Sequence, residues 1–315
     1  MPSVEQLNQC LAQLGALRPD FAQKRKRGIA PHKPLLLLAI IDMAQEGCLA
    51  DRQVALTVGL AFRFGEYWRA VAERRGTKPD VRLPFFHLRT AGFWQPLDSE
   101  GRPAAARQLA TTALLAEDFF ACLLDANFRD QARRKLISRW FEQPAERIAL
   151  YTMVGLPIPS ADSQIADSKL GEMQDAKERG REGRFRNTVI PAYDFTCALT
   201  GYRVNTFRES IVDAAHIHQF GRGGANDPRN GIALCKNAHW LFDRGLWSLT
   251  DDYRVIVTQE DFLEAGPEAF LLRRMIGKVI GLPSQAHLRP DPKHLAWHRQ
   301  HALGGNRGGH LARGA

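Results

Sequence analysis

The pattern of apolar and polar positions separates a helix-rich first part of the chain from a later part in which short strands and helices mix. Helical periodicity marks six segments of the first part: 4–17, 30–42, 54–68, 110–114, 117–125 and 130–142. The segment 30–42 is apolar on nearly all sides, which is typical of a helix enclosed by others. We expect it to form the centre of a first hydrophobic core.

The segment 82–97 has a different pattern. Its aromatic residues and Gly92 predict a turn and a strand leading into residues 94–97. In extended backbone, His87 and Arg89 point to one face, where an imidazole and a guanidinium could together hold a phosphate. The alternative is a histidine at the edge of the core beside a solvated arginine.

The later part alternates strand, loop and helix signals. These are, in chain order, a strand ending at His216, a glycine-rich loop, a turn at 226–228, an apolar strand over 231–234, a helix carrying His239 and Asp243, a hairpin over 247–249 and 253–257, and a helix over 262–280.

A polar, aromatic-poor stretch separates the two parts, and the 315 residues suit two domains of ordinary size. A linker with some helix is expected over residues 156–180. The sequence predicts an α+β fold with a mainly helical domain over 1–155 and a second domain over 181–303. Residues 304–315 are expected to form a disordered tail.

The spacing of three polar residues in the second domain indicates hydrolytic chemistry. His239 and Asp243 lie four apart, so on a helix they can offer a nitrogen and an oxygen to one divalent ion. His216, at the end of a strand, can face that ion and take a proton from water. A positioned base beside a divalent cation is what phosphodiester hydrolysis requires.

These residues carry a resemblance to a known family. Ala215-His216-Ile217, the run from Asn230 to Cys235, His239 and Asp243 resemble the HNH, or ββα-metal, nuclease motif. The resemblance implies that His216 is the general base and that Asn230 pins the loop by hydrogen bonds. It also implies that His239 is a metal ligand, and Asp243 fits a second ligand position.

One position departs from the motif. Many members carry an Asp or His ligand immediately before the base, where this chain has Ala215. Asp213 is the nearest replacement, but residues three apart in a regular strand point to opposite faces, so this role needs a bend or bulge. His218 shares a strand face with His216, and a ligand, a phosphate contact and a partly exposed strand histidine remain open for it.

Charge indicates a polyanionic partner. Lys and Arg outnumber Asp and Glu by 43 to 34, which gives a formal charge of +9 and a pI near 9.6. Two basic stretches, 24–27 ending at Arg27 and 179–186, are either solvated faces or contacts to a phosphate backbone.

The five cysteines, at positions 10, 48, 122, 197 and 235, are odd in number and widely spaced, so a reducing cytoplasm fits better than a disulfide framework. The sequence contains no CxxC pair, so the zinc clamp of some HNH domains is not predicted. Cys197 and Cys235 are predicted to be buried packing residues. The N-terminus lacks a secretory leader, and the longest apolar run is too short to span a bilayer. We expect a cytoplasmic protein without a membrane partner.

The first part carries a second resemblance. The runs 31–38, 84–88 and 92–94 resemble the N-terminal region of HNH restriction endonucleases. Within that group they are similar to the sulfur-binding domain of McrA-type enzymes, which cut phosphorothioate-modified DNA. The resemblance implies an apolar cup for the sulfur at Phe128, Arg129 and Ala132, with Arg129 in place of the usual proline. The DNA-contacting residues would include His87, Arg89, Lys33 and Arg27.

The two resemblances together imply a type IV-like, modification-dependent restriction endonuclease. It would bind phosphorothioate-modified double-stranded DNA and cut near the mark with a divalent metal, Mg²⁺, Mn²⁺ or another transition metal. A homodimer would give each strand its own active site. The alternatives are an HNH enzyme for methylated, hydroxymethylated or unmodified DNA, and a DNA-binding regulator with a degenerate nuclease domain.

Overall fold

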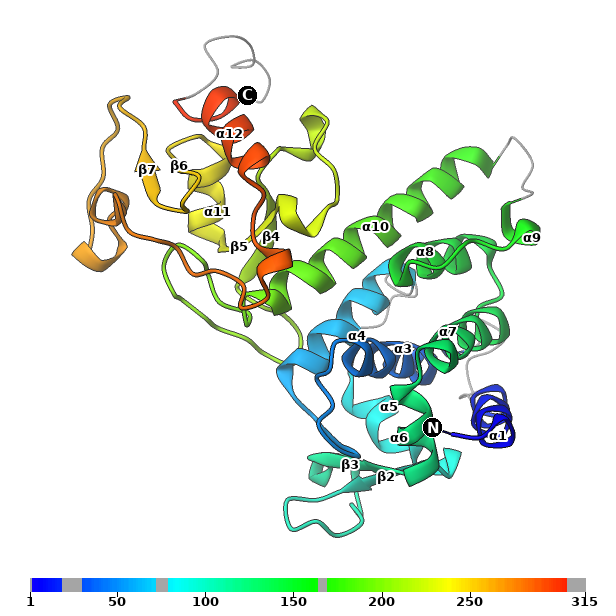
Figure 1. The fold of residues 1–315 in the computed structure, drawn as a ribbon. Helices are drawn as coiled ribbons and strands as arrows, with labels where there is room; N and C mark the ends of the chain where they lie inside the picture. Colours follow the sequence, from blue (N-terminus) through cyan, green and yellow to red (C-terminus); the bar gives the residue numbers. More distant parts are fainter. Residues whose placement is uncertain (1, 19–29, 72–78, 164–168, 305–315) are drawn as a thin grey trace, which may run out of the picture. The chain divides into compact units, whose positions relative to one another are not determined.

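The computed structural model describes residues 2–18, 30–71, 79–163 and 169–304 (Figure 1). The chain folds into two compact units. The first comprises Met1–Arg184 with Thr206–Glu209, and the second comprises Phe185–Asn205 with Ser210–Ala315. The basic run 24–27 and the tail beyond residue 304 lie outside the described residues.

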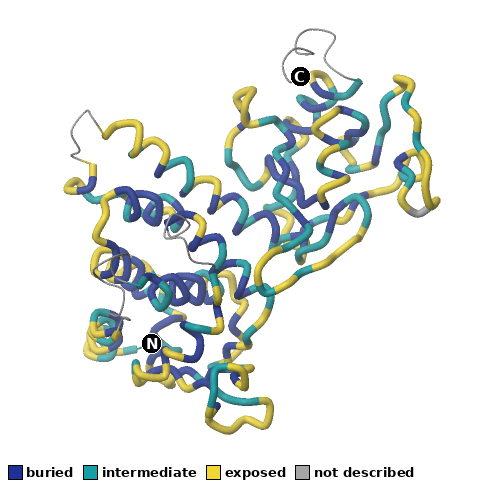
Figure 2. Tube along the Cα trace, turned by 180° about the vertical axis from the view of Figure 1, so that it is seen from behind, coloured by how far each residue is buried: buried dark blue, intermediate teal, exposed yellow. Residues whose placement is uncertain are grey.

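The first unit is a group of helices beside one small sheet. Its helices are α1 (Val4–Gly15), α3 (His32–Gln45), α4 (Val58–Val71), α5 (Arg82–His87), α6 (Glu117–Leu124), α7 (Ala126–Trp140), α8 (Pro144–Val154) and α9 (Ser160–Ser163). The antiparallel sheet has the order β1 (Gln53–Ala55), β3 (Thr112–Leu115) and β2 (Trp94–Leu97). As its composition predicts, α3 is the central helix, because every residue from Pro34 to Ile41 is buried (Figure 2).

Two of the predicted helices in this unit are wrong in part. Residues 53–55 form β1 before α4 begins, and residues 112–115 form β3 instead of a helix. Val54 and Ala113 pair across the two strands and are both fully buried. Over runs this short, periodicity does not separate a strand from a helical turn, and the pairing partner decides.

The backbone over 82–91 is also not the predicted turn and strand. It forms α5 and then a 3-10 turn over Leu88–Ala91, and only Trp94–Leu97 is a strand. Gly92 ends the turn with a φ of 80°, a conformation that favours glycine. Trp94 donates its indole N–H to the carbonyl oxygen of Phe85, which ties the strand to α5.

The helix α10 (Leu170–Ala192) occupies much of the predicted linker and continues beyond residue 180. Gly180 explains how it packs on α8. A Cβ at this position would lie 2.4 Å from the carbonyl oxygen of Ala149 and 2.7 Å from Cβ of Thr152, so only glycine permits this approach.

The second unit contains the predicted order of strand, loop, strand and helix. Its elements are β4 (Val212–His216), β5 (Gly231–Cys235), α11 (Lys236–Asp243), β6 (Trp247–Leu249), β7 (Val255–Val257) and α12 (Pro292–His301). The β4–β5 ladder is antiparallel and regular, from Val212 opposite Cys235 to His216 opposite Gly231. All five residues of β5 are buried, so this strand forms the centre of the second core.

The helix predicted over 262–280 is wrong. The segment forms only two 3-10 turns, Glu268–Phe270 and Leu272–Met275, joined by irregular backbone. Gly266 and Gly277 have φ values of 149° and 76°, which interrupt any regular helix.

None of the described helices is long and apolar enough to cross a membrane.

Candidate active site

His216 ends β4 and is held from two directions. The ring of Phe185, from α10, stacks on the imidazole with ring centroids 4.2 Å apart and 7° between the planes. Nε2 of His216 lies 2.7 Å from Oδ1 of Asn226, in the loop between β4 and β5. The imidazole is only partly buried, so it is fixed in direction yet open to solvent on part of its surface.

The residue opposite His216 in the ladder must be small. A Cβ on Gly231 would lie 2.4 Å from Cγ2 of Val189 and 2.9 Å from the ring of Phe185. The backbone of Gly231 is ordinary extended strand, with a φ of −115°, so the need for glycine is one of space. Gly231 therefore allows α10 to pack directly behind the strand end that carries His216.

Asn230 is fully buried and joins two parts of the loop. Its Oδ1 accepts a hydrogen bond from the backbone N–H of His218 at 2.7 Å. Its Nδ2 donates to the carbonyl oxygens of His218 and Ala225, both at 2.9 Å. These bonds are the ones that a loop-pinning asparagine needs.

His239 and Asp243 face each other on α11, as their spacing predicts. Nε2 of His239 is 3.3 Å from Oδ2 of Asp243. Partial burial raises the pKa of Asp243, while positive charge on His239 and on His216 acts in the opposite direction. His216, His239 and Asp243 all lie on the β4, β5, α11 segment of the second unit.

Asp213 approaches His239 from the other ring nitrogen. Its Oδ2 lies 3.6 Å from Nδ1 of His239 and also forms an ion pair with Lys236. Its Oδ1 lies 3.8 Å from Nη1 of Arg186. Burial disfavours the ionised carboxylate, but the interactions with His239, Lys236 and Arg186 outweigh it and lower the pKa of Asp213 to about 2. The carboxylate is therefore ionised at neutral pH.

The bend or bulge that would bring Asp213 to the side of His216 is not present. Each residue of β4 pairs with one residue of β5, so Asp213 and His216 leave the strand on opposite faces. Asp213 contacts Nδ1 of His239, whereas Asp243 lies at Nε2. The two carboxylates thus flank the imidazole and do not converge on one point beside it.

Comparison with known proteins gives this arrangement a family. Residues 197–250 match the family model described as HNH endonuclease. The chain contains an HNH endonuclease domain. The matched residues include the whole β4, β5, α11 segment and every candidate catalytic and metal-binding residue named above.

Two solved structures of restriction endonucleases are similar to parts of the chain. One is a modification-dependent restriction endonuclease, TagI, with 21% identity over 37% of this chain and 36% of that chain, and a TM-score of 0.28. The other is the type IV phosphorothioation-dependent restriction endonuclease ScoMcrA, with 14% identity over 76% of this chain and 84% of that chain, and a TM-score of 0.26. The chain thus spans little more than a third of TagI. No curated protein matched the chain.

The donor atoms of the HNH domain fit a divalent ion at one place. Two neighbouring ligands, each about 2.0–2.2 Å from one ion, lie about 3 Å apart. The 3.3 Å between Nε2 of His239 and Oδ2 of Asp243 is close to this separation. Among the described residues no group of three or more His, Cys, Asp or Glu side chains is arranged to hold a metal. His239 and Asp243 would supply two of the ligands of such an ion.

His218 has a different environment from His216. Its ring stacks on Trp297 of α12 with centroids 3.9 Å apart, and its Nε2 lies 3.0 Å from the carbonyl oxygen of Arg222. This nitrogen is occupied within the loop. His218 is partly exposed, as one of the three open roles has it, but it lies beyond the end of β4 and packs on α12.

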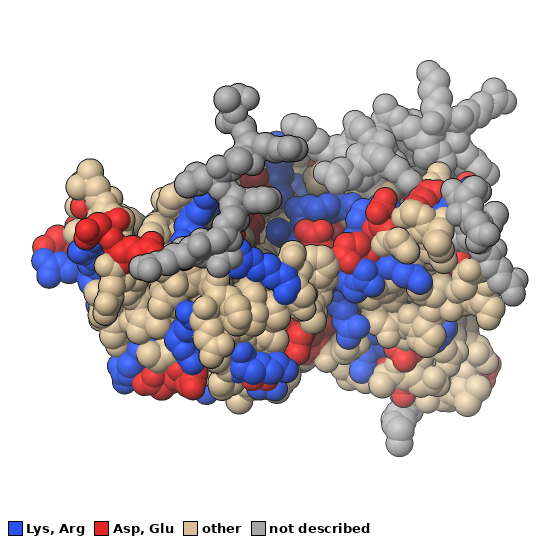
Figure 3. Space-filling model, turned by 90° about the horizontal axis from the view of Figure 1, so that it is seen from above, with Lys and Arg blue, Asp and Glu red and all other residues tan. Residues whose placement is uncertain are grey.

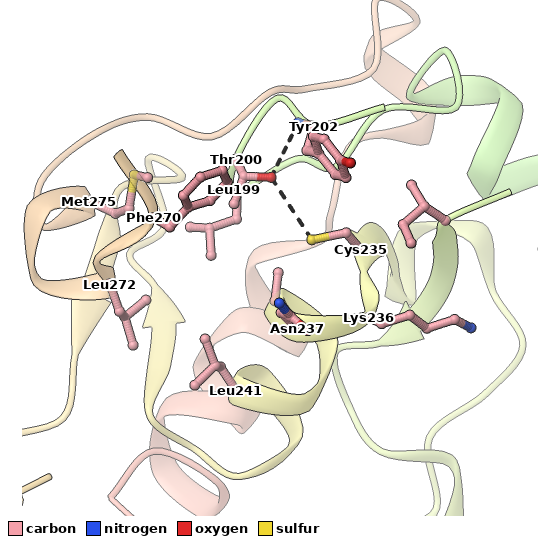
Figure 4. A pocket seen from close by; sticks show the side chains of 12 residues that line it. Leu199, Thr200, Tyr202, Cys235, Lys236, Asn237, Leu241, Phe270, Leu272 and Met275 are labelled. Carbon is pink, nitrogen blue, oxygen red and sulfur yellow. Dashed lines mark hydrogen bonds between the residues drawn. The ribbon is translucent and has the colours of Figure 1, made fainter. Parts of the chain in front are cut away.

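The HNH domain also contains a pocket of about 340 Å³ at the N-terminal end of α11 (Figure 4). Thr200 and Cys235 lie on its wall, with the Thr200 hydroxyl 4.0 Å from the sulfur of Cys235.

Cys197 and Cys235 are both buried and form no disulfide, as predicted. A hydrogen bond between the two thiols lowers the pKa of Cys197, whereas it raises that of Cys235.

In the first unit, Lys33 lies beside the segment that carries His87 and Arg89. Its ammonium group donates to the carbonyl oxygen of Arg18 at 2.8 Å and to the hydroxyl of Thr90 at 3.2 Å. Burial lowers the pKa of Lys33. The predicted DNA-contacting residues Lys33 and Arg89 are therefore brought to neighbouring places.

The expected common strand face of His87 and Arg89 is wrong, because their backbone is helical. Both side chains are exposed. The guanidinium carbon of Arg89 lies 4.1 Å from the ring centroid of Phe86, which orients the charge at the surface. The remaining predicted contact, Arg27, lies outside the described residues.

The residues predicted to form a sulfur cup lie in and beside the core. Phe128 and Ala132 are fully buried on the inner face of α7, where Phe128 meets Phe119 edge-on at 6.0 Å. The guanidinium of Arg129 donates to the carbonyl oxygens of Leu123 and Leu124 at the end of α6. Phe128 and Ala132 thus belong to the core and Arg129 caps the end of α6, and a sulfur cup at these residues stays a prediction.

Phe185 and Asn226, which flank His216, were missed from the sequence. Phe185 carried one usable signal: it lies four residues before Val189, so an apolar stripe runs through the arginine-rich stretch. Asn226 carried none beyond its place in a turn, since its side-chain contact depends on the path of the whole loop.

Proposed function

We propose that this chain is a metal-dependent endonuclease of the restriction type, which hydrolyses phosphodiester bonds of double-stranded DNA. The observation that carries the proposal is the His239–Asp243 pair, 3.3 Å apart on α11, in an HNH domain whose strand β4 ends at His216. In this proposal the three residues supply a base and two ligands. Phosphodiester hydrolysis needs both.

The residues have distinct roles in this proposal. His216 takes a proton from the attacking water, and Asn230 keeps the loop beside it in place. His239, through Nε2, and Asp243 hold the divalent ion. When bound, the ion stabilises negative charge on the scissile phosphate and on the leaving oxygen. Phe185 keeps the imidazole of His216 in its plane and shields one of its faces from water.

Asp213 has a supporting role in place of the ligand role expected from the sequence. A carboxylate at the second nitrogen of a ligating histidine fixes the orientation of the ring and makes the ligand more basic. Asp213 occupies that position at Nδ1 of His239 and is ionised. We therefore assign it to the orientation of His239.

The substrate is proposed to be modified DNA, with phosphorothioate as the first mark to test. The support is the resemblance of the runs 31–38 and 84–94 to sulfur-binding domains of McrA-type enzymes. Because Phe128 and Ala132 are buried, we propose that the surface around Lys33, His87 and Arg89 contacts the DNA instead.

The substrate is tested with matched duplexes that are unmodified, phosphorothioate-bearing or cytosine-methylated, each incubated with Mg²⁺ or Mn²⁺. Cutting of the phosphorothioate duplex alone is the expected result. Cutting of the methylated or unmodified duplex instead would keep the nuclease and reject the mark. Binding without cutting in any metal would favour a regulator whose nuclease domain is degenerate.

The catalytic assignment is tested with His216→Ala. We expect cleavage to fall by about 100-fold or more, since general base catalysis contributes factors of this order. DNA binding, measured by gel shift, should stay near that of the wild type. A variant that loses binding instead would show that His216 contacts DNA and is not the base.

A further inference from the structure

The solvent-facing side of α11 carries more than the candidate metal ligands His239 and Asp243. Trp240 and Arg244 are four residues apart, the same spacing as the ligands, so they too lie together on the helix surface. Arg244 ends the helix and donates its backbone N–H to the carbonyl oxygen of Trp240 at 3.1 Å, so the helical spacing extends to it. Trp240 also precedes Asp243 by three residues, which makes these two residues neighbours on the helix. The Trp240–Arg244 pair therefore lies beside the candidate metal ligands.

Exposed aromatic side chains lie next to both parts of the candidate site. Next to the metal ligands, Trp240 has an exposed fraction of 57%, and the guanidinium carbon of Arg244 lies 5.5 Å from its ring centroid. Next to the candidate base, Phe220 has an exposed fraction of 46%, and its ring centroid lies 5.6 Å from that of His216. Aromatic side chains and arginine are enriched where proteins bind partners, because they offer apolar area together with directed polar groups. The exposed rings therefore indicate a binding surface at these residues.

An indole and a guanidinium held together match the chemistry of one nucleotide in a DNA strand. The carbon face of a deoxyribose is apolar and can pack on an indole, whereas the phosphate beside it accepts hydrogen bonds from the planar fork of an arginine. We propose that Trp240 and Arg244 bind the DNA strand that is cut, with Trp240 against a deoxyribose and Arg244 at the phosphate beside the scissile one. This inference rests on the proposed nuclease function and adds a substrate-binding surface to it.

Arg244 also places a cation where an approaching DNA strand needs one. The carboxylates of Asp213 and Asp243 repel a phosphate backbone. Lys236 forms an ion pair with Asp213. Arg244 directly follows Asp243 and is exposed, so its guanidinium can meet a phosphate that approaches the candidate site. Its charge favours a polyanion over an uncharged partner at this surface.

The charge of the pair is tested with Arg244→Ala in the full chain. Fluorescence anisotropy without metal follows the binding of a phosphorothioate-bearing duplex at several salt concentrations. We expect the affinity to fall by about 10-fold and the slope of log affinity against log salt concentration to decrease by about one, as for one lost phosphate contact. Arg274→Ala, the matched control, removes an exposed arginine of the same domain that is paired with Glu268, and should leave both quantities unchanged.

The ring is tested with Trp240→Ala and Trp240→Phe. We expect Trp240→Ala to lower the affinity for the duplex by about 10-fold, since an aromatic side chain that packs on a nucleotide contributes a factor of this order. Trp240→Phe keeps a ring and should recover part of the loss. In cleavage with Mn²⁺, Trp240→Ala should raise KM and leave kcat nearly unchanged, because the contact is made before and during the reaction alike. Phe270→Ala removes an exposed ring at the pocket of the HNH domain and, as the control, should behave as the wild type.

The affinity for Mn²⁺ separates a DNA contact from support of the metal ligands. Calorimetry without DNA should give the wild-type value for both Trp240→Ala and Arg244→Ala. Loss of Mn²⁺ binding in these variants would overturn the inference, and so would wild-type binding and cleavage of DNA by both. If the wild type bound the duplex but cut no DNA with any metal, the proposed function would fail. The anisotropy would still decide whether Trp240 and Arg244 contact DNA, so the two failures are distinguishable.

Discussion

At the scale of single residues, the two histidines of the candidate site face different polar partners. His216 faces a neutral carboxamide, whereas His239 faces a carboxylate. A base should remain unprotonated at rest, and a metal ligand gains from a partner that increases its electron donation. These partners match the different roles proposed for the two histidines.

Asp213→Asn should weaken metal binding by about 10-fold to 100-fold, because His239 loses its charged partner but keeps Nε2. The affinity for Mn²⁺ of the full chain, measured by calorimetry without DNA, checks this. Asp252→Asn, which neutralises an exposed carboxylate, is the control. A loss as complete as that of Asp243→Asn would make Asp213 a direct ligand, and no loss would leave it without a role in metal binding.

The candidate residues could be read from the sequence only where local spacing defines their contacts. The four-residue step from His239 to Asp243 directly predicts that the two side chains meet on a helix. His216 and Asn226 are ten residues apart, and their contact depends on how the whole loop folds. The local sequence does not determine that path. Phe128 shows the converse: whether an aromatic side chain faces water depends on residues packed from elsewhere in the chain.

At the scale of elements, His298 is a buried contact between α12 and the rest of the HNH domain. His298 is fully buried, stacks on Phe242 of α11 at 3.8 Å, and lies 2.9 Å from the hydroxyl of Ser248. Burial lowers the pKa of His298 to about 4, so the folded protein holds it neutral. Contact with α12 therefore depends on an uncharged imidazole.

Acid should loosen this contact. The pKa of His298 is lower in the folded chain than the 6.5 of an unperturbed histidine, so between these values the unfolded state binds more protons. Stability is full above pH 6.5 and falls as the pH decreases towards 4. From pH 7.5 to 5.0 the loss is about 2 kcal/mol.

Urea unfolding followed by tryptophan fluorescence at pH 7.5 and 5.0 measures this loss. His298→Gln removes the titrating group, so its stability should decrease less over the same interval. Equal decreases in the variant and the wild type would assign the acid sensitivity to other groups.

Element prediction succeeded where composition and period agreed over a sufficient length. The apolar run of α3 and the order β4, β5, α11 were readable for this reason. The predicted helix over 110–114 is too short to show a period, and residues 112–115 form a strand by pairing with β1 and β2. The segment 262–280 has apolar residues at helical intervals, but its glycines prevented a helix.

At the scale of the whole molecule, the chain has a net charge of +9. On the face drawn in Figure 3, Lys and Arg side chains are interspersed with Asp and Glu. Individual exposed cations can each contribute to attraction for a phosphate backbone. Arg89, exposed and held over Phe86, is such a cation.

Arg89→Ala should weaken DNA binding and reduce the slope of log affinity against log salt concentration by about one, as expected for the loss of one phosphate contact. Fluorescence anisotropy at several salt concentrations measures both quantities. Arg102→Ala removes the same charge from an exposed arginine that is paired with Asp98 and Glu100, and should leave the slope unchanged. Equal effects of the two substitutions would indicate a general effect of net charge.

The packing of α10 behind β4 defines where the nuclease module begins. The family match starts at residue 197, but the ring that covers His216 belongs to Phe185, and the space left by Gly231 is filled by Val189. A fragment excised at the border of the family match would retain every motif residue and lose the platform on which the imidazole rests. The smallest transplantable catalytic unit is therefore longer than the recognisable motif, and it includes the last two turns of the preceding helix.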